Sequence, residues 1–144
     1  MKVKEKKNIF CSIEKCLGCK SCEIACAVEH SKSKDLFASI GEFPLPRQRR
    51  KVEAIKNLRL STACQHCESA GCIDACMSGA IYKDDRGAVL HDEEKCVGCW
   101  MCIMACPFGV ISRQEKIALK CDLCPDRDEY ACVKACPTRA LCAT

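Results

Sequence analysis

Four groups of four cysteines recur along this chain and constrain its fold more than any other feature of the sequence. Every group opens with two cysteines separated by two residues and closes with two separated by three. The groups are Cys16, Cys19, Cys22 and Cys26; Cys64, Cys67, Cys72 and Cys76; Cys96, Cys99, Cys102 and Cys106; and Cys121, Cys124, Cys132 and Cys136. Such a repeat predicts that the cysteines act in sets of four.

The rest of the composition leaves little to hold a fold together. The 144 residues include 18 cysteines but only four Phe, two Tyr and one Trp, so disulfides or metal must replace a large core. The charged start Met1–Lys7 has no apolar stretch behind it, and no run is long enough to span a membrane. We therefore expect a cytoplasmic protein with reduced thiols, which favours metal; peripheral attachment to a membrane-bound complex stays open.

The spacing within the groups points to [4Fe–4S] clusters. A C-x-x-C-x-x-C loop can wrap three corners of a cubane, and Gly18 and Gly98 fall where the backbone must approach the sulfides. The fourth cysteine follows one helical turn later, about 6 Å along the axis, and so reaches a neighbouring cluster, as in two-cluster ferredoxins. A zinc-binding structural protein is the alternative from another class, but zinc sites usually separate two C-x-x-C pairs.

The net charge depends on whether clusters are bound. The chain carries 23 basic and 19 acidic residues, a formal +4. Four clusters with their thiolates, each a formal −2, would bring the loaded protein to about −4. Nucleic-acid binding is not expected, because no binding motif accompanies the basic run Arg47–Lys51.

The segments between the cysteines predict short elements. Short helices are expected over 22–30, 72–78, 102–107 and 132–137, each carrying the last cysteine of its group. A hairpin is expected over Ala80–Leu90 around an Asp-Arg-Gly turn, and short strands over 9–13 and 140–142. Residues 31–60 lack cysteine and read as an insertion, in which 52–60 fits either a strand or a short helix.

The stretch Cys72–Ile111 resembles a bacterial two-cluster ferredoxin. The complete layout resembles the four-cluster ferredoxin-like subunits of formate dehydrogenases, dimethyl sulfoxide reductases, hydrogenases and carbon monoxide dehydrogenases. Three strings, Cys22–Ser31, Cys76–Ala80 and Cys96–Cys102, are most similar to the iron–sulfur subunit that accompanies anaerobic carbon monoxide dehydrogenase.

This resemblance implies a non-enzymatic electron-transfer protein. Its expected role is to relay single electrons from carbon monoxide dehydrogenase to a hydrogenase, a flavin reductase or another ferredoxin. The alternative within the class is an electron-transfer subunit of a formate dehydrogenase, a hydrogenase or another molybdopterin oxidoreductase. No nucleophile–base pair or open metal site is visible in the sequence.

The resemblance also implies which cysteines share a cluster. Groups one and four pair, as do groups two and three, so that each cluster takes three cysteines from one group and one from its partner. Set A is Cys16, Cys19, Cys22 and Cys136; set B is Cys121, Cys124, Cys132 and Cys26; set C is Cys64, Cys67, Cys72 and Cys106; set D is Cys96, Cys99, Cys102 and Cys76.

The same pairing implies the domain organisation. The expected fold is α+β, with two ferredoxin-like modules related by a pseudo-two-fold and wrapped around four [4Fe–4S] clusters. Module one takes residues 1–30 plus 112–144, residues 31–60 are the insertion, and module two takes residues 61–111.

Two cysteines remain outside the sets. Cys11 and Cys142 are expected to be small buried side chains, with a redox-active pair as the alternative. Because the end strands should pair, we expect these two residues to be reduced and to lie near one another.

Four other features have open roles. We expect His66 to pack or hydrogen-bond near set C, and His30 and His91 to lie on the surface. Trp100 should either shield set D from water or form part of a docking face. The run Arg47–Lys51 reads as a solvated face, with a docking patch for an acidic partner as the alternative.

Overall fold

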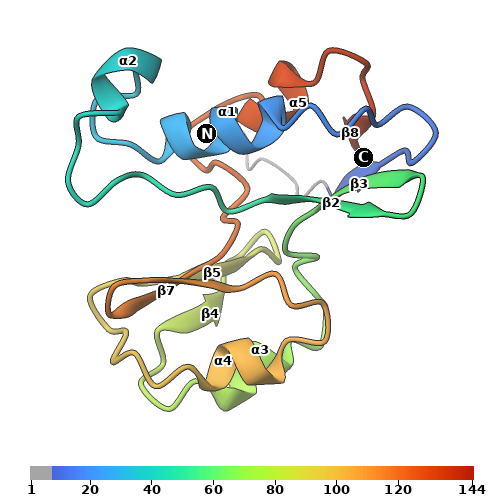
Figure 1. The fold of residues 1–144 in the computed structure, drawn as a ribbon. Helices are drawn as coiled ribbons and strands as arrows, with labels where there is room; N and C mark the ends of the chain where they lie inside the picture. The colour runs from blue at the N-terminus through green and yellow to red at the C-terminus, as the bar shows by residue number, and fades with distance from the viewer. Residues whose placement is uncertain (1–7) are drawn as a thin grey trace.

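The computed structural model describes residues 8–144, so the charged segment Met1–Lys7 lies outside the described residues. Within this range the protein is a small α+β structure of short helices and two-stranded sheets, as expected (Figure 1). The helices are α1 (Ser21–Glu29), α2 (Leu36–Ser39), α3 (Gly71–Ala75), α4 (Met101–Ala105) and α5 (Ala131–Ala135). The strands are β1 (Ile9–Cys11), β2 (Lys51–Ile55), β3 (Leu58–Thr62), β4 (Ile81–Lys83), β5 (Val89–His91), β6 (Ser112–Gln114), β7 (Ile117–Leu119) and β8 (Leu141–Ala143).

Four of the helices lie at the expected places, but three of them end earlier than expected. Among the last cysteines of the four groups, only Cys26 lies within its helix. Cys76, Cys106 and Cys136 each follow the last helical residue, with ψ between 103° and 115°. This extended backbone turns the chain out of the helix, so the last cysteine caps the helix instead of continuing it.

The expected hairpin and the pairing of the end strands are both present. β4 pairs with β5 in antiparallel register, and β1 pairs with β8 with Phe10 opposite Cys142 and Cys11 opposite Leu141. Directly opposed residues share a face, and successive residues alternate. Cys11 and Cys142 are therefore near one another along the β1–β8 pair, but their side chains lie on opposite faces of it.

Two further hairpins were not anticipated. Residues 51–62 form neither a single strand nor a helix, but the β2–β3 hairpin, and residues 112–119 form the β6–β7 hairpin. Their turns begin at Lys56 and Glu115, whose φ values are +54° and +50°. Glycine or asparagine usually fills such positions, so these turns lack the sequence signal of a tight hairpin.

The elements gather into two lobes (Figure 1). In one, α1 packs against α5 beside the β1–β8 pair; in the other, α3 packs against α4 below β4 and β5. Cysteines form a large part of both cores: Cys22, Cys124 and Cys132 in the first, and Cys102 in the second. Ala118 on β7 packs in the second core, although the sequence assigned residues 112–144 to module one.

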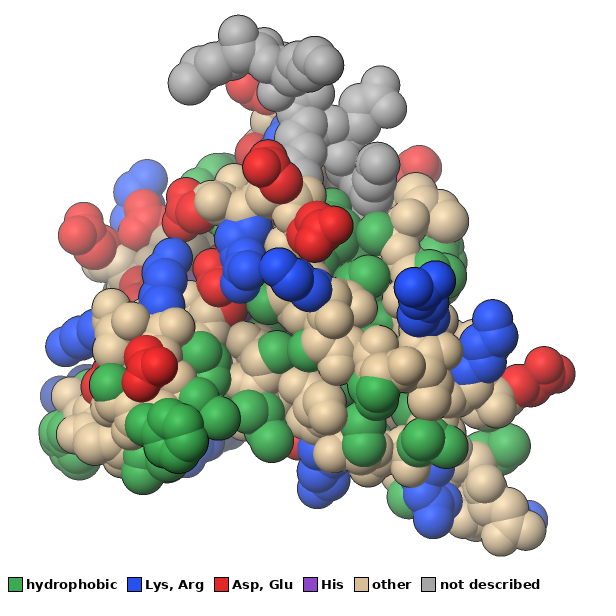
Figure 2. All heavy atoms as spheres, turned by 90° about the horizontal axis from the view of Figure 1, so that it is seen from above, with side chains coloured by type: hydrophobic (Ala, Val, Ile, Leu, Met, Phe, Trp, Pro, Cys, Tyr) green, Lys and Arg blue, Asp and Glu red, His purple; other side chains and the backbone are tan. Residues whose placement is uncertain are grey.

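The surface over α1, α2 and α5 intersperses acidic and basic side chains with small hydrophobic patches (Figure 2). No broad area of one sign appears on this face, which gives no support to a nucleic-acid surface. Across residues 8–144, none of the helices is long and apolar enough to cross a membrane.

Candidate metal centre

A sulfur-lined cavity of about 250 Å³ lies between α3 and α4. A concave site with converging donor atoms is a candidate place for a bound group. Four of its lining residues are the cysteines expected in set C: Cys64, Cys67, Cys72 and Cys106. The fourth, Cys106, directly follows α4, and the four sulfurs supply the donors that an iron–sulfur cluster requires.

Two smaller cavities bring together the cysteines of sets A and D. One is lined by Cys16, Cys19, Cys22 and Cys136. The other is lined by Cys76, Cys96, Cys99 and Cys102, together with Trp100. In each case three cysteines come from one loop and the fourth from a helix end of another group.

The cysteines of set B are the most buried. Burial raises the pKa of Cys121 to about 12 and that of Cys124 to about 11, and the neighbouring Cys26 thiol contributes to both shifts. Burial likewise raises the pKa of Cys132, again with a contribution from Cys26. Thiols in such surroundings resist ionisation unless a cation joins them, as metal binding would provide.

At Cys19 and Cys76, hydrogen bonds favour the thiolate. The Ser21 side chain and N–H lower the pKa of Cys19, and the two side chains lie 3.4 Å apart. Burial acts to raise the pKa of Cys76, but the Ile81 N–H and the Ser78 hydroxyl outweigh it, so the pKa is lowered. Because hydrogen bonds to sulfur also set cluster potentials, these donors fit the chemistry of iron–sulfur ligands.

The glycines of the loops are needed for reasons that the sequence did not reveal. Gly98 has φ +70°, and a Cβ there would lie 2.5 Å from the carbonyl oxygen of Lys116. Gly18 has φ +69°, and its Cβ would lie 2.9 Å from the Arg59 side chain. The positive φ disfavours larger residues at both positions, and at Gly98 a backbone oxygen adds to this cost, before any approach to sulfide is considered.

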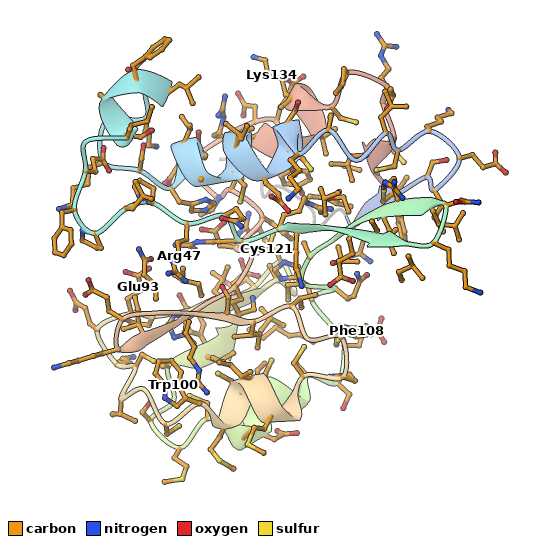
Figure 3. All side chains as sticks on the ribbon, viewed as in Figure 1. Arg47, Glu93, Trp100, Phe108, Cys121 and Lys134 are labelled. Carbon is orange, nitrogen blue, oxygen red and sulfur yellow. The ribbon has the colours of Figure 1, made fainter. Side chains whose placement is uncertain are left out.

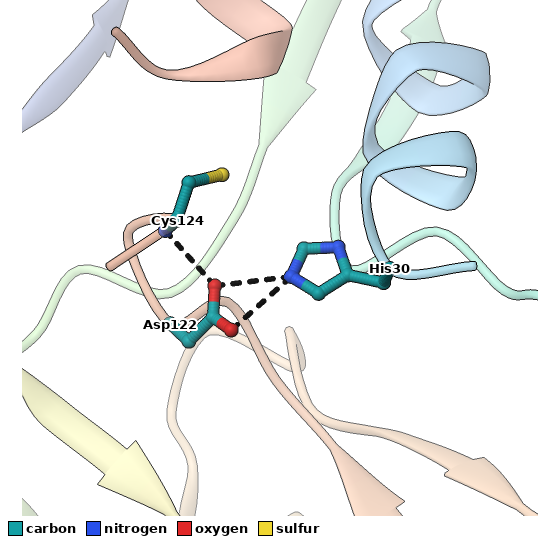
Figure 4. Close-up of side chains that lie close together, drawn as sticks. All are labelled: His30, Asp122 and Cys124. Carbon is teal, nitrogen blue, oxygen red and sulfur yellow. Dashed lines mark hydrogen bonds and ion pairs between the residues drawn. The ribbon is translucent and has the colours of Figure 1, made fainter. Parts of the chain in front are cut away.

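His30 is not a surface residue but part of a charged network beside set B (Figure 4). Its Nε2 lies 3.1 Å from Oδ1 of Asp122, and its Nδ1 lies 2.7 Å from the Cys26 carbonyl oxygen. Burial acts to lower the pKa of His30, but the hydrogen bond with Asp122 outweighs it and raises the pKa to about 10. Burial acts to raise the pKa of Asp122, but His30 and Arg49 together lower it to about 2.

This network surrounds the sulfurs and is not itself a metal site. Asp122 accepts hydrogen bonds from the Cys124 N–H at 3.0 Å and from Arg49 at 3.2 Å. The Arg49 N–H donates to Cys26 Sγ at 3.2 Å. His30 and Asp122 are thus held by other protein groups, and Cys124 belongs to set B, so the three serve to order the sulfurs.

His66 lies near set C, as expected. It is 1% exposed, its Nδ1 accepts the Val89 N–H at 3.0 Å, and its own N–H donates to Cys64 Sγ at 3.4 Å. His91 is half-buried rather than on the surface, and burial lowers its pKa. Trp100 lines the cavity of set D, and the guanidinium of Arg113 stacks 4.6 Å from its ring centroid.

The two spare cysteines differ from one another. Cys11 is half-buried, and the Ser61 N–H donates to its Sγ at 3.5 Å. Cys142 is exposed, so the expectation of a buried side chain is wrong there. Neither is in a disulfide, and the 18 cysteines are all free.

The run Arg47–Lys51 is not a uniform solvated face. Arg47 and Lys51 are exposed, but Arg49 pairs with Asp122 and Glu93, and Arg50 is only 5% exposed. The sequence also gave no reason to single out Lys120, which is 1% exposed. Arg49 contacts Asp122, 73 residues away, and Lys120 contacts Val89, 31 residues away, so no local pattern could identify these contacts.

Comparisons with known proteins agree with this site. The family model for a 4Fe–4S dicluster domain matches residues 55–144, and a 4Fe–4S binding domain matches residues 13–29. The electron transport protein HydN of Escherichia coli K12 is 39% identical, over 92% of this chain and 85% of HydN. The thiosulfate reductase electron transfer subunit PhsB of Salmonella typhi is 35% identical, over 89% of this chain and 70% of PhsB.

An iron–sulfur protein of Rhodospirillum rubrum is 38% identical, over 96% of this chain and 82% of that protein. Among solved structures, the BamBC complex of benzoyl coenzyme A reductase superposes with a TM-score of 0.53 at 24% identity. The match covers 96% of this chain and 79% of that one, and it speaks to the fold alone. From the cysteine sets and the extent of these matches, we conclude that the chain belongs to the 4Fe–4S dicluster family of ferredoxin-like electron-transfer proteins.

Proposed function

We propose that the protein relays single electrons through four [4Fe–4S] clusters held by sets A to D. The observation that carries this proposal is the cavity lined by all four cysteines of set C, one of them from the end of the neighbouring helix. Four sulfur donors would saturate each cluster, which leaves no open position for a substrate. Such ligation suits outer-sphere electron transfer and not catalysis.

Sets A and D would form the two ends of the relay. Cys19 in set A and Cys99 in set D are exposed, whereas Cys26, Cys124 and Cys132 of set B are buried. The packing of α1 on α5 and of α3 on α4 supports two ferredoxin-like modules, and their pseudo-two-fold relation stays a prediction. Electrons would enter at one exposed end and leave at the other.

The partner we favour is an oxidoreductase such as a hydrogenase, a formate dehydrogenase or another molybdopterin enzyme. HydN is described as an electron transport protein and PhsB as an electron transfer subunit of thiosulfate reductase. Neither description supports the carbon monoxide dehydrogenase relay expected from the sequence, so the alternative fits better. A reducing compartment such as the cytoplasm suits 18 free cysteines.

Metal analysis of anoxically purified protein tests the proposal. We expect about sixteen iron and sixteen sulfide per chain, with the broad visible absorption of [4Fe–4S] clusters. Eight or fewer iron atoms in fully loaded protein, or a colourless zinc form, would contradict it. Anoxic pull-down of the native partner, with carbon monoxide dehydrogenase included among the candidates, would then identify the donor.

A further inference from the structure

Two buried cations have no carboxylate partner within the part of the chain that the structure describes. Arg50 is 5% exposed and Lys120 is 1% exposed. Among residues 8–144, the ion pairs within 4.0 Å involve other cations and neither of these two. A buried charge without a counterion costs several kcal/mol, so an anion other than the carboxylates of residues 8–144 is indicated.

Arg50 lies between the sulfurs of sets A and B. Its Nη1 donates to the carbonyl oxygen and to the hydroxyl of Ser61, each at 3.2 Å. Ser61 Oγ lies 3.3 Å from Cys22 Sγ of set A. Burial raises the pKa of Cys132 of set B, and the charge and hydrogen bond of Arg50 oppose that rise. One guanidinium therefore acts on sulfurs of two sets.

Lys120 lies between the sulfurs of sets B and C. Its Nζ donates to the carbonyl oxygen of Cys121, a set B residue, at 2.8 Å, and also to the carbonyl oxygen of Val89. Val89 lines the cavity of set C. Burial and Cys64 raise the pKa of Cys72 in set C, and the charge of Lys120 opposes the rise. Figure 3 shows Cys121, the next residue, on the segment that joins the two lobes.

We propose that Arg50 and Lys120 are the counterions of the clusters on either side of them, and that their charge makes those clusters easier to reduce. The inference rests on the proposed four-cluster function. Each cluster with its thiolates is a formal dianion, and an electron from the redox partner adds one more negative charge before it moves on. No bond forms or breaks; the fixed cations offset the added charge in an interior where water cannot screen it.

The positions of the two cations predict which clusters they affect most. Set B lies beside both cations, sets A and C lie beside one each, and no such cation is assigned to set D. The cluster in set B should thus gain the most from these charges, so that an electron is stabilised in the interior of the relay and not at its exposed ends. A purely structural role for the two side chains would not change reduction potentials in this order.

Potentiometric titration monitored by electron paramagnetic resonance, on anoxic loaded protein, tests the role of charge. In Arg50→Gln and Lys120→Gln, we expect the equilibrium constant for reduction of the adjacent clusters to fall at least tenfold. For one electron, this lowers their reduction potential by at least 59 mV. Arg50→Lys and Lys120→Arg keep the charge and should stay close to the wild type. The control is Lys134→Gln, two residues from Cys132 but exposed, where solvent screening should leave potentials unchanged.

Each outcome decides the matter. Fully loaded glutamine variants with wild-type potentials would overturn the proposal. If a glutamine variant loses iron while its charge-conserving counterpart loads normally, the charge is required and the proposal stands. If both variants at a position lose iron equally, shape and not charge is what matters there, and the proposal fails. Wild-type protein without clusters would instead refute the proposed function itself.

Discussion

At the scale of single residues, the contacts around the cysteines matter to the candidate site as much as the cysteines themselves. The cysteine sets could be proposed from the spacing because the motif is local, and the cysteines of sets A, C and D line common cavities. The contacts of His30 could not, because Asp122 lies 92 residues away. The contact of Lys120 could not be predicted either, because its Nζ donates a hydrogen bond to the carbonyl oxygen of Val89, 31 residues earlier.

Gly98 provides a test at this scale. In Gly98→Ala, a Cβ would lie 2.5 Å from the Lys116 carbonyl oxygen, in addition to the cost of φ +70°. Gly79→Ala is a matched control, with φ +69° and nothing within 4 Å of its Cβ. We expect about 1 kcal/mol of destabilisation in the control and at least about twice that in Gly98→Ala.

The measurement is the temperature at which loaded protein loses its visible absorption on heating under anoxia. Gly98→Ala should bleach at a clearly lower temperature than Gly79→Ala. Equal shifts would mean that the Lys116 turn moves aside freely, and that only the backbone conformation requires glycine.

At the scale of the elements, the residues in each turn determined which hairpins could be predicted from the sequence. The β4–β5 hairpin was predictable because Gly87, with φ +81°, closes an Asp-rich turn. The β2–β3 and β6–β7 hairpins were not, because Lys56 and Glu115 occupy the left-handed positions. Tertiary packing, such as that of Ala118 in the second core, stabilises turns that local propensity would not select.

Asp84 holds the β4–β5 turn. Its carboxylate accepts from the Ala88 N–H at 2.8 Å and from Arg86 Nε at 2.7 Å. Burial acts to raise the pKa of Asp84, but the hydrogen bonds from Arg86 and Ala88 outweigh it, so the pKa is lowered. A lowered pKa means that the ionised form stabilises the fold above the unfolded value of 3.8, and that this contribution is lost only as the pH falls through the folded value.

Asp84→Asn should therefore weaken the hairpin by about 1 kcal/mol, a factor of about five in local opening. Amide hydrogen exchange of residues 81–91, followed by mass spectrometry on loaded protein, measures this opening. After correction for intrinsic exchange rates, the difference from wild type should be constant from pH 5 to 8. Asp85→Asn, at the exposed neighbouring position, is the control; a difference that shrinks between pH 8 and 5 would contradict the assignment.

Over the whole molecule, the crossing of the fourth cysteine ties together parts that are distant in sequence. Cys106 is the last cysteine of group three, yet it lines the same cavity as Cys64, Cys67 and Cys72 of group two. A shared cluster makes the effects of substitutions within one set overlap, whereas substitutions in different sets should add.

Paired serine substitutions test this connectivity. Cys72→Ser with Cys106→Ser should remove one cluster, leaving about twelve iron per chain, the same as either single variant that loses its cluster. Cys102→Ser with Cys106→Ser, which are close in sequence, should remove two clusters and leave about eight. Iron analysis with quantitative electron paramagnetic resonance distinguishes the two double variants. If Cys72→Ser with Cys106→Ser left fewer iron atoms than Cys102→Ser with Cys106→Ser, Cys106 would belong to set D.

The pairing of β1 with β8 has a consequence for how the protein is made. Residues 64–106, with α3 and α4, leave the ribosome together, so their lobe can close around its cysteines early. The other lobe cannot, because α1 must wait for α5 and β1 must wait for β8, more than 100 residues later. Until the last strand is translated, the thiols of group one stay without their partners, and it is these that a cell would have to protect from oxygen during synthesis.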